Sequence, residues 1–266
     1  MPSASVLKRG KPMPTDPDRK RAIETVAESC RILGKLDITH AAFGHVSYRL
    51  SENSMLIKAK GPDEVGLRYT SVEDIIEVDF DGNKVSGPDG LRPPSESFIH
   101  IWLMKQNPGV GSVIHVHPEH AVLLTICEKE ILPIYAAYDG SGIQLALEGI
   151  PTYPRSITIT DDVLGKDFAD FMGDKKVALM RGHGVSVVGK SIEEATVRTT
   201  QLNRIVTMTY KAYAIGEPKP ILSEDIEELT RRRADGRPSE RGSAGGDAGT
   251  LASYRYYRRL TGEEEA

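Results

Sequence analysis

Residues 112–121 have the sequence SVIHVHPEHA, in which two histidines alternate with β-branched residues ahead of a proline. The apolar residues of this run predict a short buried strand, and Pro118 is expected to begin a helix. Side chains two residues apart in a strand point to the same face of a sheet, so His115 and His117 should project side by side. Two imidazoles on one face form half of a transition-metal site. A bare His-x-His is nevertheless more often two partly exposed histidines that happen to alternate, so this segment does not establish a metal site by itself.

Other histidines favour the metal interpretation. The chain has seven histidines, and His120 brings the number within this short segment to three. His183 stands between two glycines, directly after the apolar run 177–180 and Arg181-Gly182. Glycines let the backbone turn sharply and let another group approach closely. His183 is therefore the predicted third imidazole of the site.

Glu96 lies in the sequence PPSES, residues 93–97, ahead of an apolar helix that Ser95 is expected to cap. On its own, Glu96 would be interpreted as a first-turn carboxylate that favours the helix dipole. Beside three histidines it becomes a candidate ligand and acid/base. His100, four residues further on a similar face, is interpreted as a helix-packing histidine, with a supporting role next to Glu96 as the alternative.

The order of these motifs resembles that of the class II aldolase/adducin family. Each motif alone is weak, but their order and spacing together are specific, and the similarity covers about residues 18–218. The matching segments are Pro-Ser-Glu at 94–96, His-x-His-Pro at 115–118, Gly-His-Gly at 182–184, GHVSYR at 44–49 (Gly-Asn-x-Ser-x-Arg in the family) and VDFDG at 78–82 (Val-Asp-x-Asp-Gly).

The resemblance implies an α/β fold, a three-layer α/β/α arrangement around a mostly antiparallel central sheet. It also implies one divalent metal per subunit, for which three histidines and a carboxylate suit Zn²⁺, Mn²⁺ or Co²⁺. A tyrosine acts near the site of the family's aldolases; Tyr138 is the nearer candidate here and Tyr135 the second. The implied assembly is a homo-oligomer, a tetramer or a multiple of one, with sites near subunit interfaces. The implied metal ligands are His115, His117, His183 and Glu96, of which Glu96 is also the acid/base.

The substrate-binding positions depart from those of the sugar-phosphate aldolases in this family. Those enzymes have an asparagine at the position of His45, a hydroxyl-rich turn at Lys60-Gly61-Pro62 and a serine at Pro94. A phosphate dianion requires several hydroxyl and N–H donors, some of which this chain lacks. A plain turn is an equally good interpretation of Gly61-Pro62. The residues expected to bind substrate are His45, Arg49, Lys60, Gly61 and Ser95.

These departures favour the family's decarboxylases, which act on hydroxylated aromatic or pyridine dicarboxylates, as enzymes of aromatic compound catabolism. The predicted activity is therefore a carbon–carbon lyase that decarboxylates such an acid through a metal-stabilised oxyanion. Two alternatives remain open. One is an aldolase that cleaves a sugar phosphate of the fuculose or ribulose type. The other is a non-catalytic binding module like adducin, whose version of the domain lacks the metal-binding residues.

Composition narrows the class of protein. The chain has 266 residues, 39% of them hydrophobic, and a net charge of −4, which indicates neither a nucleic-acid nor a membrane partner. Its two cysteines have no CxxC spacing and suit a reducing compartment. No run approaches the length of a membrane span, and no signal peptide is recognisable at the N-terminus. A cytoplasmic enzyme for a small molecule is expected.

Four regions are predicted along the chain. Residues 1–15 are expected to form a flexible arm, and residues 16–230 the catalytic domain. Residues 231–249, rich in Gly, Ser and Arg, are expected to form a mobile linker. Residues 250–266 form a Tyr/Arg-rich C-terminal segment, interpreted either as a packing helix or as a segment that reaches a neighbouring subunit's site.

Overall fold

A computed structural model describes residues 16–135, 140–234 and 247–263 of the chain. An eight-stranded sheet with the strand order β4-β3-β2-β1-β5-β8-β7-β6 crosses this part of the molecule. Neighbouring strands are antiparallel except β6 and β7, which are parallel. The strands are β1 His45–Arg49, β2 Ser54–Lys58, β3 Ile75–Asp79, β4 Lys84–Ser86, β5 Ser112–Val116, β6 Thr152–Tyr153, β7 Val177–Met180 and β8 Gly184–Gly189.

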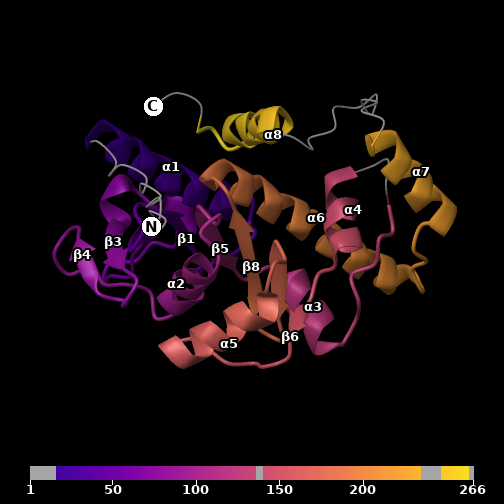
Figure 1. The fold of residues 1–266 in the computed structure, drawn as a ribbon, viewed down its shortest axis with the longest axis horizontal. Helices are drawn as coiled ribbons and strands as arrows, with labels where there is room; N and C mark the ends of the chain where they lie inside the picture. The colour runs from indigo at the N-terminus through magenta and orange to yellow at the C-terminus, as the bar shows by residue number, and fades with distance from the viewer. Residues whose placement is uncertain (1–15, 136–139, 235–246, 264–266) are drawn as a thin grey trace, which may run out of the picture.

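Helices cover both faces of the sheet (Figure 1). One core lies between the sheet and the helices α1, α3, α4 and α6, and the other lies between the sheet and α2 and α5. The α/β prediction, with three layers and a mostly antiparallel sheet, is confirmed. The helices are α1 Asp16–Lys35, α2 Ser97–Gln106, α3 Glu119–Ile126, α4 Gly140–Glu148, α5 Asp162–Met172, α6 Ile192–Ile215, α7 Ser223–Ala234 and α8 Asp247–Leu260, with short 3-10 helices η1 Leu67–Tyr69 and η2 Val72–Asp74.

Strand β5 is central, and all five of its residues are buried. Its side chains alternate between the two cores: Val113 packs toward α2 and α5, whereas Ile114 and Val116 pack on the side of α1 and α6. His115 therefore faces the α2 side, as the two-residue period of a strand requires. The same alternation, continued one step past the strand, gives His117 that direction as well.

The predicted linker at 231–249 is wrong at both of its ends. Helix α7 continues to Ala234, and α8 already begins at Asp247. The arginine-rich run stays helical because Glu228 pairs with Arg231 and Arg232 at spacings of three and four residues, which stabilises a helix. Residues 235–246, and the arm expected at 1–15, lie outside the described residues.

The described part of the C-terminal segment packs on its own chain. Helix α8 lies along α1 and α6 (Figure 1). Tyr254 is buried there and its hydroxyl donates to Glu28 at 2.7 Å, while Arg258 Nε donates to the same carboxylate at 2.9 Å. Within these contacts the segment behaves as a packing helix. Among the described residues no helix is long and apolar enough to cross a membrane.

Candidate metal centre

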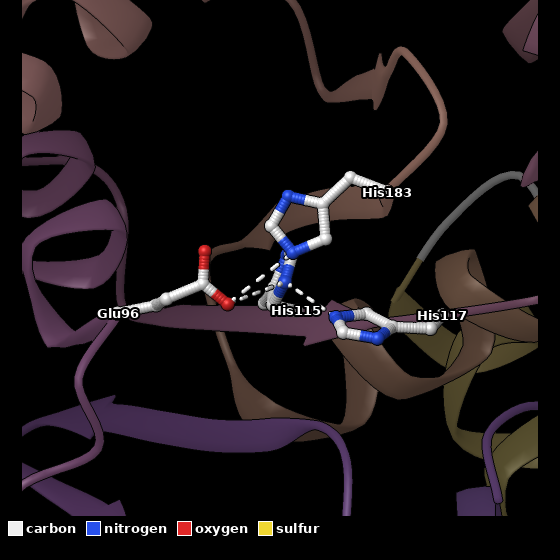
Figure 2. Close-up of side chains that lie close together, drawn as sticks. All are labelled: Glu96, His115, His117 and His183. Carbon is white, nitrogen blue, oxygen red and sulfur yellow. Dashed lines mark hydrogen bonds and ion pairs between the residues drawn. The ribbon is translucent and has the colours of Figure 1, made fainter. Parts of the chain in front are cut away.

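Four side chains from separate parts of the fold converge at one end of β5. His115 comes from β5, His117 from just beyond it, His183 from the turn between β7 and β8, and Glu96 from the start of α2 (Figure 2). Their nearest ligand atoms all lie within 4.8 Å of one another. The Nε2 atoms of His115 and His117 are 2.9 Å apart, and Glu96 Oε2 is 3.5 Å from His115 Nε2 and 3.3 Å from His183 Nε2. The structure thus brings together the four residues expected to ligate a metal.

The glycines around His183 explain how its turn reaches β5. Gly182 has a positive φ of 62°, a backbone conformation that residues with a side chain rarely adopt. A Cβ on Gly184 would lie 2.5 Å from the carbonyl oxygen of Val116 and 2.7 Å from the ring of His117. Only glycine at this position allows the turn to pack against the end of β5, and this contact places His183 opposite His117.

Hydrogen bonds behind His115 set the direction of its lone pair. His115 Nδ1 lies 3.2 Å from the hydroxyl oxygen of Ser186, and that hydroxyl is directed at the sulfur of Met180 at 3.8 Å. A hydroxyl that donates to sulfur accepts from the Nδ1–H of His115, so Nε2 is the nitrogen that faces the cluster. Such a partner behind a histidine is typical of metal-binding imidazoles.

The donor set fits a divalent transition-metal ion. Burial and the neighbouring histidines lower the pKa of His117 to about 3, so this imidazole is neutral at physiological pH. Imidazole nitrogens that converge beside a carboxylate are suitable ligands for Zn²⁺, Mn²⁺ or Co²⁺. Nδ1 of His183 is buried and has no hydrogen-bond partner in the described part of the chain, so this histidine lacks the partner that His115 has.

Glu96 is held as a carboxylate by two sets of contacts. Its Oε1 accepts the backbone N–H of Ile159 at 3.1 Å, and its Oε2 faces His115 and His183. Burial alone would raise the pKa of Glu96, but hydrogen bonds and charge from the two histidines outweigh it and hold that pKa well below its ordinary range. Glu96 itself occupies the N-cap position of α2, so the expected cap by Ser95 is wrong; Ser95 is exposed. Because the Glu96 side chain makes no cap hydrogen bond, it is available to the cluster.

His45 lies next to the cluster. It pairs with His115 across β1 and β5, and the two rings stack with centroids 5.2 Å apart. His45 Nδ1 is 2.7 Å from Nε2 of His100, so the polar contact of His100 is to His45 and not to Glu96, the residue beside which a supporting role was the alternative. Ser186 was not predicted as a site residue, although it is the one serine among the valines of β8.

Two of the residues expected to bind substrate, Arg49 and Gly61, have other contacts in the structure. Arg49 lies at the opposite end of β1 from His45, roughly 13 Å away at the rise of a strand. Its guanidinium donates to the carbonyls of Val110, at 2.9 Å, and of Met104. A Cβ on Gly61 would lie 2.5 Å from the side chain of Leu91, which favours the plain-turn interpretation.

Lys60 anchors the loop that leads to His45. Its ammonium donates to the carbonyl of Ala42 and pairs with Glu64 at 3.1 Å. Burial and the nearby Arg92 lower the pKa of Lys60, and Glu96 acts on it in the opposite direction. Of the two candidate tyrosines, Tyr138 lies outside the described residues, and Tyr135 packs against the core on the α1 and α6 side.

Comparisons with known proteins agree with this geometry. Residues 24–210 match the family described as class II aldolase and adducin N-terminal domain. The chain is 33% identical over 212 residues to a 3,4-dihydroxyphthalate decarboxylase of Arthrobacter keyseri, which covers 78% of this chain and 86% of that protein. A protein of the same name from Terrabacter sp. (strain DBF63) is 33% identical over 210 residues, covering 77% of this chain and 87% of that protein. Among solved structures, an L-fuculose 1-phosphate aldolase from Glaciozyma antarctica PI12 has a TM-score of 0.73 at 20% identity, covering 97% of this chain and 96% of that one.

Proposed function

The chain belongs to the class II aldolase and adducin family, and from that premise we propose that it is a metal-dependent carboxy-lyase acting on a hydroxylated aromatic dicarboxylate. The observation that carries the proposal is the 33% identity, over most of both chains, to a protein named for decarboxylating 3,4-dihydroxyphthalate. The convergence of Glu96 with three histidines supports it, because a non-catalytic module has no need of such a cluster. We propose His115, His117, His183 and Glu96 as the residues that hold the ion.

Decarboxylation leaves an electron pair on the ring, and a neighbouring oxygen must stabilise it. A divalent ion bound at this site supplies Lewis-acid stabilisation of that oxyanion. Glu96 is proposed to move the protons, since its carboxylate is ionised at rest and one of its oxygens is held by Ile159. In the proposed sequence Glu96 takes the proton of the substrate hydroxyl and transfers it to the ring carbon that bears the leaving carboxylate. Carbon dioxide leaves as the C–C bonding pair returns to the ring, and a solvent proton restores the hydroxyl.

The test is release of carbon dioxide from a panel of aromatic acids by the metal-loaded protein. The panel contains 3,4-dihydroxyphthalate and ortho-hydroxy pyridine dicarboxylates, with fuculose 1-phosphate and ribulose phosphates run alongside. We expect release from a hydroxylated dicarboxylate that stops on chelation and returns on addition of metal. Cleavage of a sugar phosphate with no carbon dioxide from any aromatic acid would establish an aldolase instead.

A matched pair of variants tests the role of Glu96. Glu96→Gln keeps the shape of the side chain but cannot move a proton, so the rate should fall by roughly 10²- to 10⁴-fold. Glu119→Gln is the control, because Glu119 is also a carboxylate at a helix start close to the cluster but is exposed. Equal effects of the two substitutions would contradict the proposed role.

A further inference from the structure

A buried chain of hydrogen bonds runs from β1 to α2 and back beside the metal centre. The hydroxyl of Ser47 lies 2.6 Å from Nδ1 of His100, and Nε2 of His100 lies 2.7 Å from Nδ1 of His45. Ser47 and His100 are fully buried and His45 is 4% exposed. Three polar side chains enclosed in this way must each have a defined donor or acceptor role, because a mismatched pair would leave a buried group unsatisfied.

The Ser47 end of this hydrogen-bonded series determines which atom donates in each bond. The carbonyl of Val113, which can only accept, lies 3.4 Å from the Ser47 hydroxyl and also acts as a hydrogen-bond partner of His100. The Ser47 hydroxyl donates to Val113, so its oxygen accepts from His100, and His100 carries its proton on Nδ1. Burial lowers the pKa of His100 to about 3, so the ring is neutral and has one proton only. Its Nε2 is then an acceptor.

The same reasoning passes one step further, to His45. An acceptor at His100 Nε2 requires Nδ1–H on His45. His45 is 4% exposed and contacts no carboxylate in the described part of the chain, so burial favours an uncharged ring with one proton only. Its Nε2 is consequently unprotonated and carries a lone pair. No residue in the described part of the chain donates a hydrogen bond to it.

The lone pair of His45 stands beside the proposed metal ligands. The His45 ring stacks on His115 at an angle of 29° between their planes, and both side chains leave the same face of the sheet from directly paired positions. Nδ1 points toward α2, so Nε2, on the other side of the ring, points away from α2. A ligand bound over His115 and His117 would meet a nitrogen that accepts hydrogen bonds and cannot donate them.

We propose that Nε2 of His45 accepts a hydrogen bond from a hydroxyl of the substrate, and that Ser47 and His100 are positioning residues that hold His45 in the Nδ1–H form. The identity of that hydroxyl, one borne by an aromatic acid, rests on the proposed function. A phosphate dianion has no proton to offer and would face the lone pair with its own oxygens. The arrangement thus selects a hydroxylated ligand and disfavours a phosphorylated one.

The protonated nitrogens can be read directly, without substrate. Protein loaded with Zn²⁺ and labelled with ¹⁵N in histidine is examined by long-range ¹H–¹⁵N correlation, with the signals assigned from single-histidine variants. We expect His45 and His100 both to carry the proton on Nδ1. A proton on Nε2 of His45 would overturn the proposal, whatever the enzyme's activity.

Substrate recognition is tested by binding of 3,4-dihydroxybenzoate and of the two analogues that lack one hydroxyl, measured by calorimetry. Removing one of the two hydroxyls should weaken binding to the wild-type protein. The same change in the ligand should weaken binding to His45→Phe roughly tenfold less. Metal content should be unchanged in this variant. An identical preference in both proteins would overturn the proposal.

Two substitutions of His100 separate positioning from packing. His100→Gln places an oxygen acceptor where Nε2 was, whereas His100→Asn retains a group near Ser47 and loses the contact to His45. We expect the hydroxyl preference to survive in the first variant and disappear in the second; equal behaviour of two folded variants would indicate packing alone. Should neither fold, the tautomer measurement on the wild-type protein still decides. If the wild type releases carbon dioxide but His45→Phe keeps the wild-type preference for the hydroxylated ligand, only this inference is refuted. If no aromatic acid releases carbon dioxide, the proposed function is refuted.

Discussion

The two ends of β1 belong to one sequence motif, GHVSYR, yet they have opposite chemistry. At the first end, His45 carries a lone pair beside a cluster of imidazoles and a carboxylate. At the other end, Arg49 donates to the carbonyls of Val110, Met104 and Asn107 and lies over the ring of Phe80, 5.3 Å from its centroid. The first end presents an acceptor nitrogen that no described residue donates to, and the second end has donors that are already matched.

This difference shows what a short motif can predict. Successive residues of a strand are about 3.3 Å apart, so the two ends of a five-residue strand lie roughly 13 Å from each other. One end can therefore belong to a site while the other end only stabilises the fold. The cross-strand partner, and not the motif, decides the role of each position. His45 is paired with His115, whereas the Arg49 backbone is paired with Gly111, outside the site.

The largest effect should come from removing a proposed ligand. His117→Ala deletes one imidazole of the cluster, so we expect loss of nearly all bound metal and of activity. Ser186→Ala, which removes only the group behind His115, should weaken metal binding by about 10- to 100-fold. Metal per subunit after dialysis, by elemental analysis, gives both results.

His120→Ala is the matched control for this comparison. His120 lies three residues beyond His117, but it contacts Thr207 and the ring of Tyr210 on α6 and has no place in the cluster. Its removal should leave the metal content unchanged. Equal metal loss in His117→Ala and His120→Ala would mean that the cluster is not the metal site.

The sequence was most informative where the site depends on local spacing. The alternation of His115 and His117, the glycines around His183 and the helix start at Glu96 each predict a side-chain direction from neighbouring residues. The partners of these residues come from distant parts of the chain. Ser186 meets His115 only because β8 pairs with β5, a register that no local pattern contains.

The interpretations of Arg49 and of residues 231–233 relied on neighbours in the sequence alone. Arg49 was assigned to the substrate because it shares a motif with His45, but the carbonyls that bind it belong to the last turn of α2 and to the loop before β5. The arginine run at 231–233 was assigned to a linker by composition, although pairing with Glu228 one turn earlier stabilises a helix there. Composition and motif membership do not report which group lies opposite in space.

An intermediate effect is expected at the Arg49 end of β1. Arg49→Met removes hydrogen bonds from a charged donor to backbone carbonyls, which should lower the free energy of unfolding by about 2 kcal/mol. Because the guanidinium lies away from the cluster, metal content and kcat/KM should stay unchanged. Urea unfolding measures the first quantity and the decarboxylation assay the second.

Arg155→Met is the control for this prediction. Arg155 makes an exposed ion pair with Asp167 at 3.5 Å, and such pairs contribute at most about 1 kcal/mol. A loss of kcat/KM in Arg49→Met without a loss of stability would return Arg49 to substrate binding. It would also remove the distinction between the two ends of the strand.

The smallest expected effect is on the pH dependence of stability. It distinguishes His100, which contacts His45 at the first end of β1, from Arg49 at the other end. The pKa of His100 is about 3 in the folded protein, chiefly through burial, against roughly 6.5 in an unfolded chain. Between these values the unfolded state binds a proton that the folded state does not. The stabilising contribution of neutral His100 is therefore complete above pH 6.5 and is lost as pH falls toward 3, by at most about 1.4 kcal/mol per pH unit.

The comparison is made between wild type and His100→Asn, both in chelator, so that the other histidines cancel. The difference in their free energies of unfolding should shrink by about 1 kcal/mol between pH 6.5 and 5.5. The difference between wild type and Arg49→Met should stay constant over this interval, because a guanidinium keeps its proton throughout. A constant difference for His100→Asn as well would mean that His100 is already protonated when folded. Both of its nitrogens would then be donors, His45 Nδ1 would have to accept, and the acceptor role inferred for His45 Nε2 would be lost.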